Sequence, residues 1–200
     1  MTITNVDLKT SLTEPELPGI LPVTLDDVKV FGRIDGNDDD ASLYDMISAA
    51  TVFVQRMTRR QLVNATYIYY LPWLPTEIEL PRPPLASVTS IVYIDADGAS
   101  QTMATSVYQV DAKSTPGRVK LKFGQAWPVT RDDYNAVAVT YVAGYGVAAS
   151  SVPHPLRQAI QTLVVHWYDN RDAVLIGAVS KSLEFSLSAQ LAMYKVPGGA

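Results

Sequence analysis

The sequence predicts an α+β fold in which N-terminal and C-terminal helices form one helical layer, with a small antiparallel β-sheet or barrel inserted between them. Two segments, residues 39–58 and 156–168, support the helical layer because each has apolar residues at helical spacing along one stripe. The segment between them, residues 65–142, is rich in Val, Ile, Thr and Tyr and is divided by Pro, Gly and Asp clusters, as is typical of short strands and turns. Since each apolar stripe must be buried, the two helices are expected to pack together although they lie far apart in the chain.

The helices can be bounded from capping signals and spacing. Thr24 and Asp27 have the spacing of a capping box, which predicts a short helix over residues 24–31 with Gly32 near its end. The second helix carries an apolar stripe of Leu43, Ile47, Ala50, Val54 and Met57. The stripe of the third helix consists of Leu156, Ile160, Leu163, Val164 and Trp167.

The inserted region is predicted to contain short strands at regular spacing. Asp97-Gly98 is the strongest hairpin-turn signal of the chain. The predicted strands are residues 65–71, 77–80, 87–95, 107–111, 118–123 and 136–142. Together these elements divide the chain into an N-terminal extension (residues 1–22), a body (23–172, with the β insert at 65–142) and a C-terminal tail (173–200).

Composition narrows the class of protein. The chain has 200 residues, 18% of them charged, and a formal net charge of −4, which is typical of a mildly acidic globular protein and argues against one whose main task is to grip nucleic acid. It has no cysteine, so disulfides and thiol chemistry are excluded and cytosolic folding is expected. The first residues have no signal-peptide pattern, and no apolar run approaches the roughly 20 residues of a membrane span.

Charged residues are unevenly placed in two regions. Aspartates are concentrated between Asp26 and Asp45, and Arg56, Arg59 and Arg60 follow at the end of the same predicted helix. One interpretation is that both groups complement the helix macrodipole; the other is that they meet a neighbouring subunit of opposite charge.

A second group of cations lies on one predicted strand. Arg118, Lys120 and Lys122 alternate with Val119, Leu121 and Phe123, so the cations share one face and the apolar side chains the other. This is either an ordinary solvated outer face or a basic stripe directed at an acidic neighbour or at passing DNA.

No catalytic or metal-binding pattern is complete, and no cofactor is predicted. A calcium loop starting at Asp35 would need Gly and Glu where Asp40 and Met46 stand. His154 and His166 have neither zinc-site spacing nor a cysteine ligand nearby, and His166 is expected to be partly buried against Trp167. The chain also has no Gly-x-Ser-x-Gly elbow and no phosphate-binding loop, so an enzyme is not expected.

Several motifs, taken in order, resemble those of tailed-bacteriophage head–tail connector proteins, also called adaptor or head-completion proteins, which occur in gene transfer agents as well. The resemblance covers about residues 22 to 178 and rests on the order of the motifs, because none of them performs chemistry. The motifs are Val23-Thr-Leu-Asp-Asp-Val-Lys, Arg33-Ile-Asp-Gly-Asn-Asp-Asp-Asp, Arg56-Met-Thr-Arg-Arg, Ile78-Glu-Leu-Pro-Arg-Pro-Pro-Leu-Ala-Ser-Val, Tyr93-Ile-Asp-Ala-Asp-Gly, Pro116-Gly-Arg, Phe123-Gly-Gln-Ala-Trp-Pro, Val139-Thr-Tyr-Val-Ala-Gly-Tyr-Gly and His166-Trp-Tyr-Asp-Asn-Arg-Asp.

The resemblance implies a structural virion protein that forms a ring, usually of twelve copies, under the portal. Such a ring connects the capsid to the tail, extends the DNA channel without sequence-specific binding, and offers a platform to a stopper or tail protein. The expected location is the virion neck, after assembly in the bacterial host cytoplasm, with no membrane partner. The alternatives are a stopper or other tail-completion protein, a small enzyme with an unrecognised site, and a DNA-binding module, which would need a continuous basic face.

The same resemblance implies that the C-terminal segment docks the portal; the alternatives are a flexible tail and a tail packed on its own subunit. Together with the two cation groups, the docking interpretation gives a set of expected interface residues. This set is Arg56, Arg59, Arg60, Arg118, Lys120, Lys122, Leu183, Phe185, Leu187, Leu191 and Tyr194.

Overall fold

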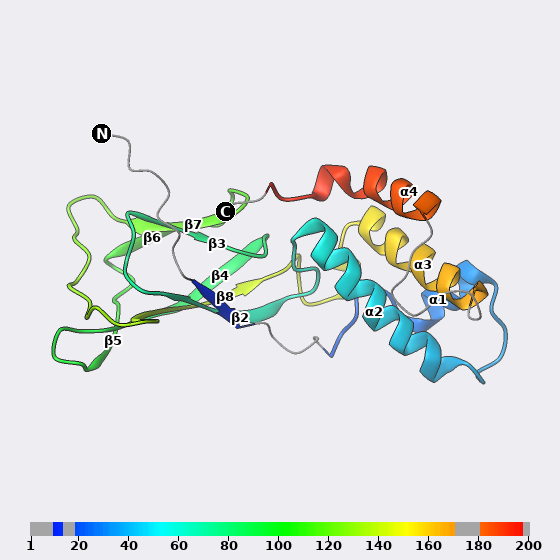
Figure 1. Cartoon of the computed structure of the whole chain (residues 1–200), viewed down its shortest axis with the longest axis horizontal. Coiled ribbons are helices and arrows are strands. Elements are labelled where there is room, and N and C mark those ends of the chain that lie inside the picture. The colour runs from blue at the N-terminus through cyan, green and yellow to red at the C-terminus, as the bar shows by residue number, and fades with distance from the viewer. Residues whose placement is uncertain (1–9, 14–18, 171–180, 198–200) are drawn as a thin grey trace. The chain divides into compact units, whose positions relative to one another are not determined.

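The chain divides into two compact units, each with its own core (Figure 1). The computed structural model describes residues 10–13, 19–170 and 181–197, and in the last range the side chains from residue 185 onward. The β unit comprises Ala65–Gly144 together with the strand Ser11–Thr13, and the helical unit comprises Leu17–Asn64 and Tyr145–Val196. The predicted α+β class with an inserted β region is therefore confirmed.

The helical unit is built from segments on both sides of the β insert. Its helices are α1 (Leu25–Gly32), α2 (Asp40–Thr58), α3 (His154–Asp169) and α4 (Lys181–Leu191), with short 3₁₀ turns η1 (Ala149–Ser151) and η2 (Ala192–Tyr194). Helix α3 packs against α1, α2 and α4. The first three helices start and end within two residues of the predicted bounds, because apolar periodicity and capping signals agree there.

Both predicted apolar stripes are buried against each other. Leu43, Ile47, Ala50 and Val54 of α2 are inaccessible to solvent, and α3 contributes Leu156, Ile160, Leu163 and Val164 to the same core. Trp167, 3% exposed, belongs to the same core, and Met57 is partly buried against it. Burial of this continuous apolar surface is the main stabilising term of the unit, since exposed helices of this length are marginal on their own.

The start and the end of α1 have local explanations. The Thr24 hydroxyl accepts a hydrogen bond from the Asp27 amide at 3.1 Å, and the Asp27 carboxylate accepts one from the Thr24 amide at 3.1 Å, so the predicted capping box is confirmed. Gly32 closes the helix where it approaches α3: a Cβ at this position would lie 2.9 Å from Val165 Cγ2. Close packing therefore explains a glycine that the helix pattern alone does not.

The β unit contains two antiparallel sheets. The five-stranded sheet has the order β1-β2-β8-β4-β5 and the three-stranded sheet the order β3-β7-β6. The strands are β1 (Ser11–Thr13), β2 (Ala65–Leu71), β3 (Glu77–Leu80), β4 (Leu85–Ile94), β5 (Ser100–Thr102), β6 (Tyr108–Asp111), β7 (Gly117–Leu121) and β8 (Val137–Ala143). The three-residue strands β1 and β5 are absent from the sequence prediction, and β5 pairs with β4 across the predicted turn at Asp97-Gly98, where Gly98 has a φ of +87°.

The two sheets share one core. Ile78, Tyr108 and Val119 of the small sheet pack in the same cluster as Ile91 and Val139 of the large one. At its centre the rings of Tyr67 and Tyr141 stack with centroids 5.6 Å apart. Burial raises the pKa of Tyr141, so its hydroxyl stays protonated and donates to the Pro81 carbonyl at 2.9 Å.

The prediction for the end of β7 was wrong at Phe123. Val119 faces the core as expected, but the strand ends at Leu121 and Phe123 is fully exposed. Alternation fixes the face of a side chain only while the strand continues, and here the backbone turns at Gly124, whose φ is +76°. Within the described ranges, no helix is both long and apolar enough to cross a bilayer.

Candidate interaction surfaces

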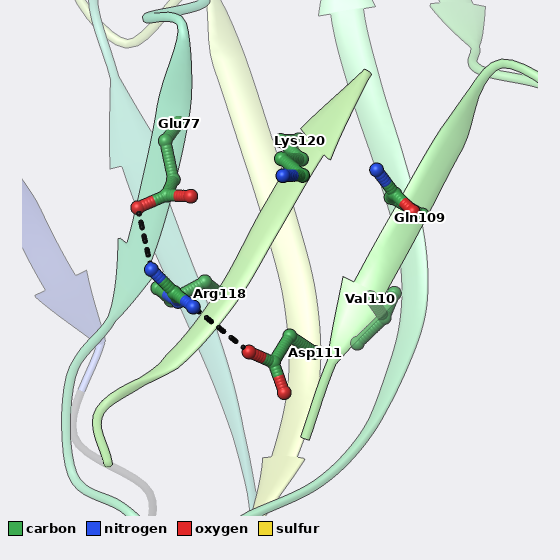
Figure 2. A pocket seen from close by; sticks show the side chains of 6 residues that line it. All are labelled: Glu77, Gln109, Val110, Asp111, Arg118 and Lys120. Atoms are coloured by element: carbon green, nitrogen blue, oxygen red, sulfur yellow. Dashed lines mark hydrogen bonds and ion pairs between the residues drawn. The ribbon is translucent and has the colours of Figure 1, made fainter. Parts of the chain in front are cut away.

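The outer face of the three-stranded sheet carries a mixed charge cluster (Figure 2). Arg118 of β7 lies between two carboxylates, with Nη1 3.3 Å from Glu77 Oε1 of β3 and Nη2 3.0 Å from Asp111 Oδ2 of β6. The sequence interpretation of Arg118 as part of a basic stripe is therefore not supported, because acidic residues of both neighbouring strands neutralise it. The register of three strands, which a single strand pattern does not reveal, produces this pairing.

Lys120 and Gln109 extend the same face. Lys120 lies opposite Glu77 on one side and Gln109 on the other, and its exposed side chain forms no ion pair with any described residue. The residues around Arg118 enclose a shallow pocket of about 240 Å³. Lys122 lies beyond the strand and donates to the Thr105 carbonyl at 3.0 Å. Of the three predicted cations, Arg118 is neutralised, whereas Lys120 and Lys122 keep exposed charged groups that form no ion pair with a described residue.

Asp111 accepts more hydrogen bonds than Glu77, the other acid of the cluster. Hydrogen bonds from the Ser114 hydroxyl at 2.6 Å and from Arg118, together with the Lys113 amide at 3.0 Å, hold the pKa of Asp111 well below its usual range. These groups bind the ionised form and so favour it.

Replacing Asp111 by asparagine is expected to remove an acid-sensitive part of the stability of the β unit. Because the folded-state pKa is depressed, the wild-type contribution is present above the ordinary aspartate pKa of 3.8 and is lost as the pH falls through the folded value. Urea unfolding of wild type and Asp111→Asn at pH 6, 4 and 3 should show a stability difference that shrinks on acidification. A difference that is constant with pH would contradict this assignment.

The arginines at the end of α2 occupy different environments. Arg56 and Arg59 are exposed, and Arg59 ends the helix in a left-handed conformation with a φ of 57°. Arg60 is half-buried: its Nε donates to the Tyr194 carbonyl at 2.6 Å and thereby ties η2 to the end of α2. Two of the three predicted interface arginines therefore present free guanidinium groups, and the third holds the helical unit together.

The predicted contact residues of the C-terminal tail also include both buried and exposed side chains. Leu187 and Leu191 are 1% and 2% exposed and belong to the core of the helical unit. Their side chains are therefore not available to a partner. Phe185, by contrast, is 79% exposed on α4, and Tyr194 is partly buried against the core. The side chain of Leu183 lies outside the described residues. Within the described side chains of the predicted tail, residues 185–197, the exposed face of α4 is available to a partner.

The histidines do not form a metal site in the described part of the chain. His154 is exposed at the start of α3, whereas His166 is partly buried and has Nδ1 3.4 Å from the Asn170 amide nitrogen. Across residues 10–13, 19–170 and 185–197 no group of three or more potential acidic, histidine or cysteine ligands gathers closely enough to hold a metal ion.

The connection between β7 and β8 exposes apolar side chains, and the sequence did not predict that any of them would be exposed. Phe123, Val129 and Tyr134 are fully exposed, 77% exposed and 86% exposed. The loop is nevertheless anchored, because Trp127 Nε1 donates to the Pro75 carbonyl at 2.8 Å and the Arg131 amide donates to the Ile94 carbonyl at 3.0 Å. Exposed aromatic groups on an anchored loop are typical of protein contact surfaces.

Solved structures with the same fold come from gene transfer agent particles. A chain in the structure described as "Neck of empty GTA particle computed with C6 symmetry" is 18% identical, with a TM-score of 0.76 over 95% of this chain and 97% of that chain. Chains in "Virion of native gene transfer agent (GTA) particle" (21% identical, TM-score 0.73, 94% and 97% covered) and "Neck of native GTA particle computed with C12 symmetry" (20% identical, TM-score 0.71, 95% and 97% covered) are similar as well. No curated protein sequence matches.

Sequence comparison assigns the family directly. The family model described as "Head completion protein" matches residues 22–177, which include α1, α2, the whole β insert and α3. The match covers most of the chain and confirms the resemblance found in the sequence motifs. The chain therefore belongs to the head completion protein family and is a structural head–tail connector protein.

Proposed function

We propose that this protein forms a homo-oligomeric ring beneath the portal in the virion neck, where it connects the capsid to the tail and extends the DNA channel. The observation that carries the proposal is the head completion family match over residues 22–177, which spans both structural units. The likeness in fold to chains of particle necks computed with C6 and C12 symmetry supports a ring, and twelve copies would satisfy both symmetries. The role is structural and uses no cofactor or catalytic group.

A ring in this position has protein partners on both sides and DNA in its channel. The portal lies on one side and a stopper or tail protein on the other, and the genome passes through the lumen without sequence-specific binding. A formal net charge of −4 suits this passage, since phosphate contacts to many cations would hold the DNA in place. Assembly takes place in the host cytoplasm, and the finished protein is located in the virion.

Native mass spectrometry of the purified protein, alone and mixed with its portal protein, tests this function. The expected result is a ring, or a complex in which the portal carries a matching number of copies. A protein that stays monomeric and ignores the portal would overturn the proposal. A protein that binds the assembled neck but not the portal would instead support a stopper.

The exposed face of α4 is the proposed portal contact. Phe185→Ala is expected to weaken portal binding about tenfold, because exposed aromatic side chains that enter a partner's pocket commonly contribute more than about 1 kcal/mol. Surface-immobilised portal titrated with the variant measures the change. Ser188→Ala, also exposed on α4, is the matched control and should bind like wild type. Equal affinities of Phe185→Ala and the control for the portal would show that the portal contact does not include Phe185.

A further inference from the structure

The charges of the helical unit are separated along α2. Two stretches of the helical unit, residues 46–64 and 145–168, contain no aspartate or glutamate. Among the described side chains of the helical unit, the carboxylates lie instead in α1, in the turn before α2, in the first turns of α2 and at the last residue of α3. Because α2 has 19 residues, its two ends are about 28 Å apart.

One end of α2, here called the basic end, consists of Arg56, Arg59, Arg60 and Lys195. Arg60 joins this end to η2 through the Tyr194 carbonyl, which brings Lys195 beside the arginines. Arg56, Arg59 and Lys195 are exposed, and no described residue forms an ion pair with them. Met193, in the same turn as Tyr194, adds an apolar side chain that is 79% exposed.

The other end, here called the acidic end, consists of Asp35, Asp38, Asp45 and Asp169. All of these residues are exposed without an ion-pair partner among the described residues. The hydrogen bond from the Tyr168 hydroxyl to Asp39 Oδ2, 2.8 Å long, places the end of α3 beside the start of α2. Arg33 is the exposed cation of this region, while Lys29 is paired with Asp40.

Exposed apolar side chains accompany the acidic end as well. Val30 and Phe31 at the end of α1 are 80% and 45% exposed, and Tyr44 in the first turns of α2 is 51% exposed. The helix macrodipole accounts for Asp40 and Arg56 in the terminal turns. It also favours Asp38, but it does not account for Asp169 at the negative end of α3, for a lysine contributed by η2, or for apolar groups left in water at both ends.

We infer that the basic end of one copy binds the acidic end of the next copy and so forms the head-to-tail contact of the ring; this inference rests on the proposed function. The chain carries both halves of a complementary pair on one packed body, at separate positions. A contact between two different patches of identical subunits is heterologous, and it closes into a ring when the rotation between neighbours divides a full turn. Complementary charge fixes the register, while the apolar groups supply buried area.

Charge reversal of each end tests the inference by native mass spectrometry and negative-stain electron microscopy. Arg56→Glu/Arg59→Glu gives a chain with two acidic ends, and Asp38→Lys/Asp45→Lys gives a chain with two basic ends. Each variant alone should form at least tenfold less ring than wild type, because like charges then meet at every contact. An equimolar mixture should form rings again, with the two variants alternating. Lys113→Glu, a charge reversal at an exposed residue of the β unit that belongs to neither end, should assemble like wild type.

The outcomes separate the possible failures. Rings formed by either charge-reversed variant alone, or no rings in the mixture when each variant keeps the wild-type unfolding midpoint, would overturn the head-to-tail pairing. Normal rings of Arg56→Glu/Arg59→Glu that bind a DNA duplex less well would assign the basic end to DNA and overturn it too. A wild-type protein that forms no ring, alone or on the portal, would overturn the proposed function along with the inference.

Discussion

Leu163→Ala is expected to destabilise the helical unit by about 2–5 kcal/mol, the range for a truncated core leucine. Leu163 is inaccessible to solvent and packs in the cluster that joins α2 to α3. The substitution leaves a cavity in a contact formed by segments far apart in the chain. Chemical denaturation followed by far-ultraviolet circular dichroism should show a lower midpoint for helix loss.

The matched control for Leu163→Ala is Gln158→Ala, an exposed position on the same helix. It should change the free energy of unfolding by less than about 0.5 kcal/mol. Similar midpoints for the two variants would contradict the packing of α3 described above.

Gly117→Ala is expected to destabilise the β unit by about 1–3 kcal/mol through overpacking. A Cβ at Gly117 would lie 2.5 Å from Leu85 Cβ and 2.6 Å from Leu85 Cδ2, and a Cβ cannot move away without shifting its backbone. Leu85 starts β4 in the large sheet, while Gly117 starts β7 in the small one, so the strain falls where the two sheets meet. Urea unfolding followed by near-ultraviolet circular dichroism, to which the buried tyrosines of the β unit contribute, measures the change.

Gly19→Ala provides the comparison for Gly117→Ala. An added Cβ at Gly19 meets no atom within 4 Å, and its φ is not in the left-handed region, so stability should stay within about 0.5 kcal/mol of wild type. A loss as large as that of Gly117→Ala would show that glycine flexibility, and not the contact with Leu85, causes the effect.

Most of the fold could be predicted where local signals agree with burial. The helices α2 and α3 have long apolar stripes that also face each other, and the strands β2 and β3 begin and end as predicted, because turn residues bound them on both sides. Short elements without such signals were missed. β1 and β5 have three residues each and are held by pairing to a neighbour, which a three-residue pattern does not reveal.

The candidate surfaces depend on contacts between distant segments and were therefore harder to predict. The alternation of cations along β7 was correctly predicted. The carboxylates that neutralise Arg118, however, come from β3 and β6, and only the register of the sheet brings them beside it. On α4, Leu187 and Leu191 look like free apolar residues in sequence, yet tertiary packing buries them and leaves Phe185 outside. The grouping of the arginines at the end of α2 could be predicted from sequence because residues at one helix end stay together in any fold, and their role as interface residues stays a prediction.

Electron microscopy of the neck in assembled particles tests the connector assignment most directly. Particles made with this protein should show a ring of density immediately below the portal into which the helical unit and the β unit each fit, and particles made without it should lack that ring and release their DNA. A neck whose ring below the portal is unchanged in the absence of this protein would contradict the account.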